Sequence, residues 1–235
     1  MSKFNNVFKI SETIRILTTT KKFGNKDNFN LSYDQEQPAG VKENLQYLCK
    51  NFLPAYPYFV KQVHGNKISS VDIKNYSYVA DGMITREKNK VIAIKTADCI
   101  PIVIYSTCSS IICILHAGRK GIEYNIIKNA FKILGDFGFT YEAWIGPCIS
   151  KNNYLVGQDI KNTFINKDKR FSKYFLKNND KYCMDITGIV KLQLNDCNIS
   201  NISLAGLCTY ENSDLFYSYR RGLDKERFGT FCWME

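Results

Sequence analysis

The segment VIAIKTADCIPIVIYSTCSSIICILHAG, residues 91–118, is the most strongly patterned part of this chain of 235 residues. It contains three short β-branched runs separated by polar breaks: Val91–Lys95, Ile100–Tyr105 and Ile111–Leu115. Apolar runs of this length and spacing predict three neighbouring strands whose faces are buried. We therefore expect residues 91–115 to form the centre of a β-sheet.

A helix is predicted directly after these strands. His116 follows the last run, and Ala117–Gly121 (AGRKG) is a glycine-containing turn. Apolar residues then recur at helical spacing up to Gly135: Ile122, Ile126, Ala130, Phe131 and Leu134. The pattern indicates a strand, a turn and then a helix.

Elements of both kinds flank this centre. Helices are predicted at Val41–Phe52 and from a cap at Asp185 to Asn195, and strands at Ala143–Gly146, Ile202–Cys208 and Leu215–Arg220. No internal repeat, low-complexity tract or linker divides the chain. We expect residues 1–235 to form a single compact α+β domain with mixed β-sheets flanked by helices.

Composition narrows the function classes. The N-terminus lacks an apolar core of signal-peptide length, and no apolar run is long enough to cross a bilayer, so we expect a soluble, cytoplasmic protein without a membrane partner. The nine cysteines are odd in number and scattered, which favours reduced thiols. The net charge of +10 is spread over Lys-Asn-rich turns rather than a continuous stripe, which favours a solvated surface over a nucleic-acid site.

The chain contains only two histidines, His64 and His116, and each follows a strand-like apolar run. Cys99 lies between them in sequence, in a polar break between two predicted strands. Imidazole and thiolate are common zinc ligands, and three of them leave a fourth position open for water or substrate. The three residues are therefore candidate ligands of a catalytic metal.

Other residues near these candidates carry useful chemistry. Cys99 could serve as a nucleophile, and Asp98 could orient an imidazole or act as a general base. The small residues after His116 open the predicted helix, where an anion such as phosphate could dock, with Arg119 and Lys120 adding positive charge.

Six motifs occur in the order seen in one known family, from about Asn30 to the C-terminus. They are QVHG (62–65), ADGMIT (80–85), TADCIP (96–101), HAG (116–118), IGPCI (145–149) and FYSYRR (216–221). On these motifs the chain resembles the YfiH family, which includes human FAMIN and was formerly labelled a multicopper polyphenol oxidase or laccase domain. The resemblance implies the YfiH-like α+β fold.

The resemblance also implies an activity. The family is described as purine nucleoside phosphorylase with adenosine deaminase activity, acting on adenosine, inosine, guanosine and methylthioadenosine. Carried over by motif, its zinc ligands fall on His64, Cys99 and His116. Asp98, Cys99 and His116 are then the candidate catalytic residues, and the candidate contacts to nucleoside and phosphate are Lys95, Gly118, Arg220 and Arg221.

Two departures bear on substrate handling. The family pattern usually reads HAGWRG, whereas this chain has Arg119 and Lys120 in place of the aromatic residue and the arginine. The family also tends to have an Asn-Arg pair in the early helix, where this chain has Asn44 and Leu45. We expect altered or weakened binding of substrate or phosphate, with the metal ligands intact.

The alternatives make different predictions. A laccase-type centre of four coppers needs more imidazoles than two, although a single copper could replace zinc. A cysteine hydrolase acting on cell-wall precursors would use Cys99 as nucleophile, His116 as base and Asp98 as orienter, and would leave His64 without a role. A basic nucleic-acid-binding module would bind DNA or RNA in a salt-dependent manner and would not need a metal.

Overall fold

The computed structural model describes residues 7–9, 12–24, 28–33, 36–108, 110–135, 139–222 and 224–235. Its central layer is a six-stranded sheet in the order β12-β8-β6-β7-β4-β3. The strands are β3 (Ile68–Ser70), β4 (Gly82–Thr85), β6 (Ile100–Ser106), β7 (Ile112–Ala117), β8 (Tyr141–Ile145) and β12 (Ile202–Leu204). The β3–β4 and β8–β12 pairs are parallel and the other pairs are antiparallel, so the sheet is mixed, as predicted.

A four-stranded antiparallel sheet packs against this layer. Its order is β1-β2-β13-β5, formed by β1 (Val7–Lys9), β2 (Ile14–Thr18), β13 (Phe228–Met234) and β5 (Ile92–Thr96). Side chains from both sheets form one buried layer, in which Ile94 and Cys232 of the smaller sheet share a cluster with Val103 and Ile114 of the larger one. The sequence predicted residues 91–95 as a strand beside the runs 100–105 and 111–115. This strand instead belongs to the four-stranded sheet, whereas the other two lie in the six-stranded sheet.

Burial on both faces explains the continuous apolar runs. In β6, Val103 belongs to the cluster between the sheets, whereas Ile102 and Ile104 belong to the cluster beneath the helices. Successive side chains of a strand point to opposite faces, so a sheet covered on both sides needs apolar residues at every position. All seven residues of β6 and all six of β7 are buried.

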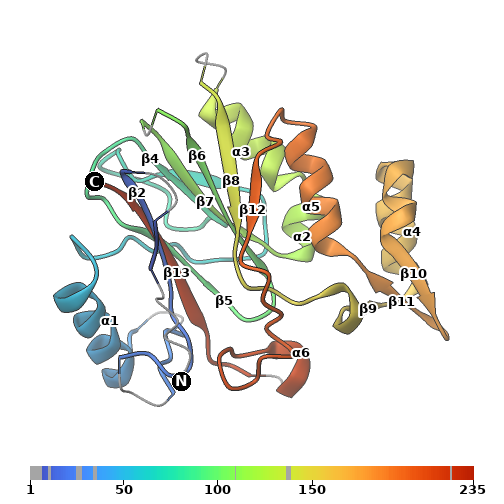
Figure 1. Ribbon diagram of the computed structural model, residues 1–235, viewed down its shortest axis with the longest axis horizontal. Helices are drawn as coiled ribbons and strands as arrows, with labels where there is room; N and C mark the ends of the chain where they lie inside the picture. The colour runs from blue at the N-terminus through green and yellow to red at the C-terminus, as the bar shows by residue number, and fades with distance from the viewer. Residues whose placement is uncertain are drawn as a thin grey trace.

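Helices cover the outer faces of the two sheets (Figure 1). α1 (Ala39–Asn51) packs on the four-stranded sheet through a cluster that includes Leu45 and Leu48. α2 (Arg119–Glu123), α3 (Ile126–Leu134) and α5 (Ile186–Asn195) cover the six-stranded sheet. The result is a layered α+β domain, and the predicted fold class is confirmed.

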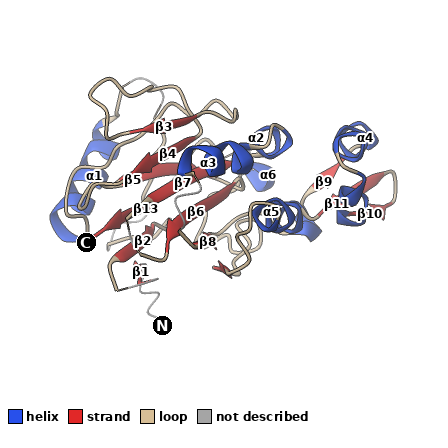
Figure 2. Cartoon of the chain, turned by 90° about the horizontal axis from the view of Figure 1, so that it is seen from above, coloured by secondary structure: helices blue, strands red, loops and turns tan. Residues whose placement is uncertain are grey.

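A smaller unit that the sequence patterns did not predict extends beyond α5. It contains α4 (Gln158–Lys167), the 3-10 helices Lys151–Asn153 and Lys169–Tyr174, α6 (Tyr219–Gly222) nearby, and a three-stranded sheet in the order β10-β11-β9. The strands are β9 (Leu155–Val156), β10 (Phe175–Asn178) and β11 (Lys181–Met184). Figures 1 and 2 both place α4 and this sheet at one end of the molecule.

Three further sequence predictions need correction. The helix predicted after Gly121 is interrupted at Asn125, whose φ of 58° is left-handed, so it divides into α2 and α3. The strand predicted at Ile202–Cys208 ends at Leu204. The strand predicted at Leu215–Arg220 is absent: within that described segment the chain turns into α6 because Ser218 and Arg220 bind the Asp98 carboxylate.

Among the described residues, no helix has the length and apolar character needed to cross a lipid bilayer.

Candidate metal centre

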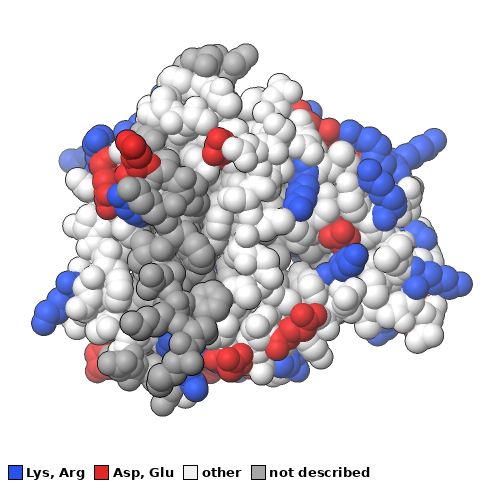
Figure 3. Space-filling model, viewed as in Figure 1, with Lys and Arg blue, Asp and Glu red and all other residues white. Residues whose placement is uncertain are grey.

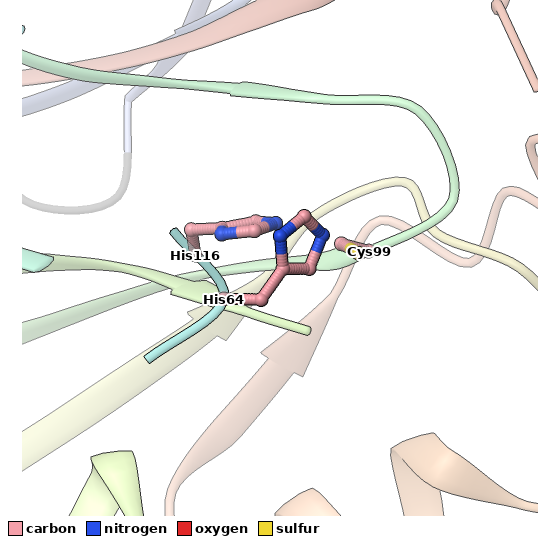
Figure 4. A group of neighbouring side chains, drawn as sticks. All are labelled: His64, Cys99 and His116. Carbon is pink, nitrogen blue, oxygen red and sulfur yellow. The ribbon is translucent and has the colours of Figure 1, made fainter. Parts of the chain in front are cut away.

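His64, Cys99 and His116 come together at one end of β6 and β7, the two central strands of the six-stranded sheet. One ligand atom of each lies within 4.8 Å of the others, and the imidazole rings meet nearly at right angles with centroids 4.8 Å apart. In Figure 4 the two rings and the Cys99 sulfur face one another. His116 is in β7, Cys99 is in the turn between β5 and β6, and His64 is in the loop before β3. The three predicted ligands are thus neighbours in space.

The His64 loop is held at both ends by hydrogen bonds. The Gln62 side chain donates to the Lys95 carbonyl and accepts from the Lys95 N–H, both at 2.8 Å, which fastens the loop to β5. The backbone N–H groups of residues 63–65 donate to the Asp81 carboxylate at 3.2, 2.9 and 2.7 Å. His64 has a φ of 59°, a left-handed conformation that is uncommon for residues other than glycine. These bonds keep it in that conformation.

His116 is fixed by Asp81 as well. It is only 3% exposed, and its Nδ1 lies 2.8 Å from the Asp81 Oδ1. Its backbone N–H also donates to the Asp81 carbonyl at 2.7 Å. A carboxylate only accepts hydrogen bonds, so Nδ1 carries the proton and Nε2 is available to a metal. The sequence offered two roles for Asp98, orienting an imidazole or acting as a general base; the carboxylate that contacts the His116 imidazole is that of Asp81 instead.

Asp98 has a different task. Its carboxylate accepts from Thr209 Oγ1 at 2.7 Å, from Ser218 Oγ at 3.1 Å and from the Arg220 N–H at 2.7 Å. Asp98 also has a left-handed backbone, with φ of 87°, directly before Cys99. The carboxylate therefore joins the Cys99 turn to the C-terminal segment that leads into α6.

The three side chains influence one another electrostatically. Burial would raise the pKa of Cys99, but the His116 charge and hydrogen bonds from both histidines outweigh it and lower this pKa from 9.0 to about 6. Burial would lower the pKa of His116, but the Cys99 thiolate and Asp81 raise it to about 9. Burial opposes ionisation of Asp81 too, yet its bonds to His116 and the loop lower its pKa. The metal-free site thus favours a thiolate beside an imidazolium.

The three residues line a pocket of about 900 Å³. Its described walls carry six cationic side chains and one carboxylate, that of Asp98; the cations are Lys61, Lys95, Arg119, Lys120, Arg220 and Arg227. Four tyrosines add aromatic surface: Tyr33, Tyr78, Tyr154 and Tyr219. This lining attracts anions and offers rings for stacking.

The predicted substrate contacts divide into two groups. Lys95 and Arg220 line the pocket: Lys95 Nζ donates to the Tyr33 carbonyl at 2.9 Å, and the Arg220 guanidinium lies 5.0 Å from the Tyr154 ring centroid. Arg221 does not line it, because its guanidinium donates to the carbonyls of residues 209, 210 and 216. Arg221 therefore stabilises a loop.

Gly118 keeps space open for the candidate ligands. A Cβ added there would lie 3.0 Å from His64 Cδ2 and 3.3 Å from Cys99 Sγ. The helix that follows, α2, has only five residues, so it does not support the phosphate site predicted where the helix opens after His116. The positive charge near the candidate ligands comes instead from the cationic side chains of the pocket.

The two family departures also have distinct surroundings. Arg119 lines the pocket and pairs with Glu123 at 3.1 Å, so it adds charge where the family usually has an aromatic ring. Leu45 is fully buried on the inner face of α1 and does not line the pocket. The structure therefore links only the first departure to the pocket.

Sequence reasoning missed Asp81, Gln62 and Arg227. Asp81 and Gln62 lie inside the quoted motifs; Asp81 directly precedes Gly82 and Gln62 lies two residues before His64, which was the available signal. Arg227 precedes β13, a strand that the patterns did not predict. Their roles depend on which chain segments are neighbours, which one sequence does not give.

The donor set fits zinc. Two imidazoles and a thiolate with a lowered pKa are typical zinc ligands, and the protonated Nδ1 of His116 leaves its Nε2 for coordination. A three-residue set leaves one position of a tetrahedral ion for a reactant. The residues would hold a zinc ion, or a single copper, at the wall of the pocket.

Comparisons with known proteins identify relatives that match most of this chain in sequence. The chain is 28% identical over 211 residues to purine nucleoside phosphorylase YfiH of Escherichia coli, covering 88% of this chain and 87% of that protein. It is 33% identical over 186 residues to a purine nucleoside phosphorylase of Rickettsia conorii, covering 77% of each.

Solved structures and a family profile extend the comparison. The crystal structure of Neisseria meningitidis protein NMB0706 superposes with a TM-score of 0.86 at 21% identity, covering 98% of this chain and 99% of that one. Bacillus licheniformis hypothetical protein YfiH gives 0.86 at 22% identity, covering 99% and 100%. The profile described as multi-copper polyphenol oxidoreductase laccase matches residues 15–235. The chain therefore belongs to that family, in which it is related to proteins named YfiH and purine nucleoside phosphorylase.

Proposed function

We propose that this protein is a zinc-dependent purine nucleoside phosphorylase of the cytoplasm, with His64, Cys99 and His116 as the metal ligands. The main support for this proposal is that these three side chains converge on the wall of a basic, partly aromatic pocket of about 900 Å³. Pockets for small ligands typically measure about 300–1,000 Å³, so a nucleoside and a phosphate fit together. The names of the relatives support the same activity. The nine free cysteines fit a reducing compartment.

The side chains of the pocket would divide the work of phosphorolysis. Phosphate would be held by lysine and arginine side chains, which neutralise its charge and direct an oxygen at C1′ of the nucleoside. The C1′–N bond breaks as the C1′–O bond forms, giving free base and ribose 1-phosphate. Tyr154, whose pKa is raised to about 12 chiefly by burial, stays protonated and could stack on or donate to the purine.

A bound zinc would supply Lewis-acid polarisation of an oxygen at its open position. The protein residues would set the geometry around it. Asp81 orients the His116 imidazole, Gly118 leaves room for the ligands, and Gln62 ties the His64 loop to β5. None of these three groups needs to touch the substrate.

Adenosine deamination is a second candidate activity of the same site. A histidine and cysteine ligand set with an open position is the arrangement that zinc deaminases use to bring water to C6 of adenine. Asp98 lines the pocket and stays a candidate proton carrier, although both of its oxygens already accept hydrogen bonds.

A cysteine hydrolase is a third candidate, and one observation favours it. The Cys99 thiolate is next to the His116 imidazole, which in turn contacts the Asp81 carboxylate. In a hydrolase these groups would act as nucleophile, base and orienter. This activity would act on an acyl substrate such as a cell-wall precursor. It would not need His64 and would be inhibited by zinc on the thiolate.

Nucleic-acid binding has less support. In Figure 3 the basic side chains are scattered over the visible face, with acidic side chains among them. A binding stripe would need a continuous row of positive charge.

One experiment distinguishes these functions. Zinc-loaded protein is incubated with adenosine, with and without phosphate, and products are identified by mass spectrometry, with elemental analysis of wild type and His64→Ala. Adenine with ribose 1-phosphate supports phosphorolysis, and inosine supports deamination. Turnover of an acyl substrate by metal-free His64→Ala would support the hydrolase. Absence of both metal and nucleoside turnover would refute the proposal.

A further inference from the structure

We infer that Asp81 is the positioning residue of the candidate metal centre. Its single buried carboxylate holds two of the three candidate metal ligands, His64 and His116, in position. The inference rests on the proposed metal site and adds a residue to it. Asp81 is completely buried, directly precedes β4 and does not line the pocket. It therefore acts through His64 and His116 and not on the substrate.

Both oxygens of the carboxylate are used. Oδ1 accepts from the His64 N–H at 2.9 Å and lies 2.8 Å from His116 Nδ1. Oδ2 accepts from the N–H groups of Val63 and Gly65 at 3.2 and 2.7 Å. Four donors around one carboxylate compensate for its removal from water. The same oxygen, Oδ1, contacts both histidines, so a movement of Asp81 shifts both ligands together.

On the His64 side, Asp81 stabilises an unfavourable backbone. His64 has a φ of 59°, in the left-handed region that few residues other than glycine adopt, although Asn, Asp and His are enriched there. Three successive N–H groups converge on the carboxylate, and this convergence requires the tight loop that bends the chain at His64. Such strain persists only when the surrounding contacts fix it. Without the carboxylate, the loop loses the acceptor that keeps His64 facing Cys99.

On the His116 side, Asp81 fixes the tautomer and the ring. The carboxylate requires a proton on Nδ1, so the lone pair on Nε2 faces the site. The backbone N–H of His116 donates to the Asp81 carbonyl at 2.7 Å, and this bond ties β7 to the residue directly before β4. Asp81 thus contacts His116 through both its side chain and its backbone.

The first test compares metal binding by two Asp→Asn variants. Asp81→Asn keeps the size of the side chain but replaces one acceptor oxygen by an NH₂ group, which must face one of the four donors. Asp72→Asn is the matched control, since Asp72 also accepts from a hydroxyl and a backbone N–H, at 2.5 and 2.7 Å, but contacts no candidate ligand. Zinc affinity is measured by competition with a chromophoric chelator, and cobalt is bound in parallel for its absorption spectrum.

Asp81→Asn should bind zinc about 100-fold more weakly than wild type, the upper end of what outer ligand partners contribute, because two ligands are released together. Its cobalt spectrum should lose the intensity of a tetrahedral thiolate site. Asp72→Asn should keep the wild-type affinity and spectrum. Thermal unfolding of all three metal-free proteins separates this effect from general destabilisation.

The second test uses the wild-type protein, so it holds even if Asp81→Asn does not fold. With only two histidines in the chain, a ¹⁵N-labelled sample gives two imidazole spin systems. In zinc-loaded protein, the His116 ring should carry its proton on Nδ1, shifted downfield and slow to exchange. The proton on Nε2, or zinc affinity of Asp81→Asn within about threefold of wild type with an unchanged cobalt spectrum, overturns the inference and leaves the zinc site standing. A wild-type protein that binds neither metal overturns both.

Discussion

Replacing Gly118 by alanine should weaken metal binding without weakening the fold. Gly118 has φ of −71° and ψ of 163°, values that alanine adopts readily. The added Cβ would lie 3.0 Å from His64 Cδ2 and 3.3 Å from Cys99 Sγ, a few tenths of an ångström inside normal contact. In the metal-free protein these side chains can move aside. With zinc bound they cannot move as far, since ligand distances tolerate only about 0.2 Å.

The magnitude follows from these contacts. Displacement of two ligands at once should lower zinc affinity about 10-fold, or about 1.4 kcal/mol. The free energy of unfolding of the metal-free protein should change by less than about 1 kcal/mol, because alanine also reduces the entropy of the unfolded chain. For a chain of this size, that corresponds to a shift in Tm of about 2–4 °C or less.

Chelator competition measures the zinc affinity, and thermal unfolding in excess chelator measures the stability of the metal-free protein. Gly40→Ala in α1 is the matched control, since a Cβ there meets nothing within 4 Å. It should keep the wild-type zinc affinity and gain about 0.5–1 kcal/mol from helix propensity. Wild-type zinc affinity in Gly118→Ala, or a loss of zinc matched by an equal loss of metal-free stability, would refute the reasoning.

Three further predictions concern individual residues of the site. His64→Ala should reduce bound zinc to less than about one tenth of the wild-type stoichiometry at micromolar metal, and chelator should then no longer lower its Tm; undiminished zinc would remove His64 from the ligand set. In zinc-free protein, alkylation of Cys99 by iodoacetamide should rise with pH and level off above about pH 7, because its pKa is lowered to about 6, whereas zinc should protect it; a rate still rising toward pH 9 would contradict the thiolate assignment. Asp98→Asn should lower the free energy of unfolding by about 2–3 kcal/mol in chemical denaturation, because three donors lose a charged acceptor; an unchanged midpoint would contradict this role.

The sequence predicted the elements whose signal is local. β6 and β7 are buried on both faces, so nearly every residue in them is apolar and the runs are easy to recognise. The ligand trio was predicted because the chain has so few histidines. Asn125 was missed as a break, because it sits between two helices of the same apolar spacing and its left-handed backbone leaves no signal in the periodicity.

The remaining features depend on contacts between distant segments. β13 reads FGTFCWM, with a glycine and a threonine among aromatic residues, and becomes a strand because β2 and β5 lie on either side of it. Asp81 and Asp98 are both aspartates in short polar breaks, but only Asp98 is adjacent in sequence to a candidate ligand, Cys99. Only the pairing of Gly82 with Leu115, one residue from His116, brings Asp81 to the imidazole. Tertiary register of this kind is not encoded in a short window of sequence.

The position of β13 has a consequence for how the protein is made. Thr18 in β2 pairs with Thr230 in β13, so the four-stranded sheet joins segments more than 200 residues apart. During synthesis, β2 leaves the ribosome long before its partner exists, and its apolar side chains stay uncovered meanwhile. Pairings of such sequence separation form slowly and leave nascent chains open to aggregation. Production of this protein should therefore benefit from slow translation and from chaperones that shield exposed strands.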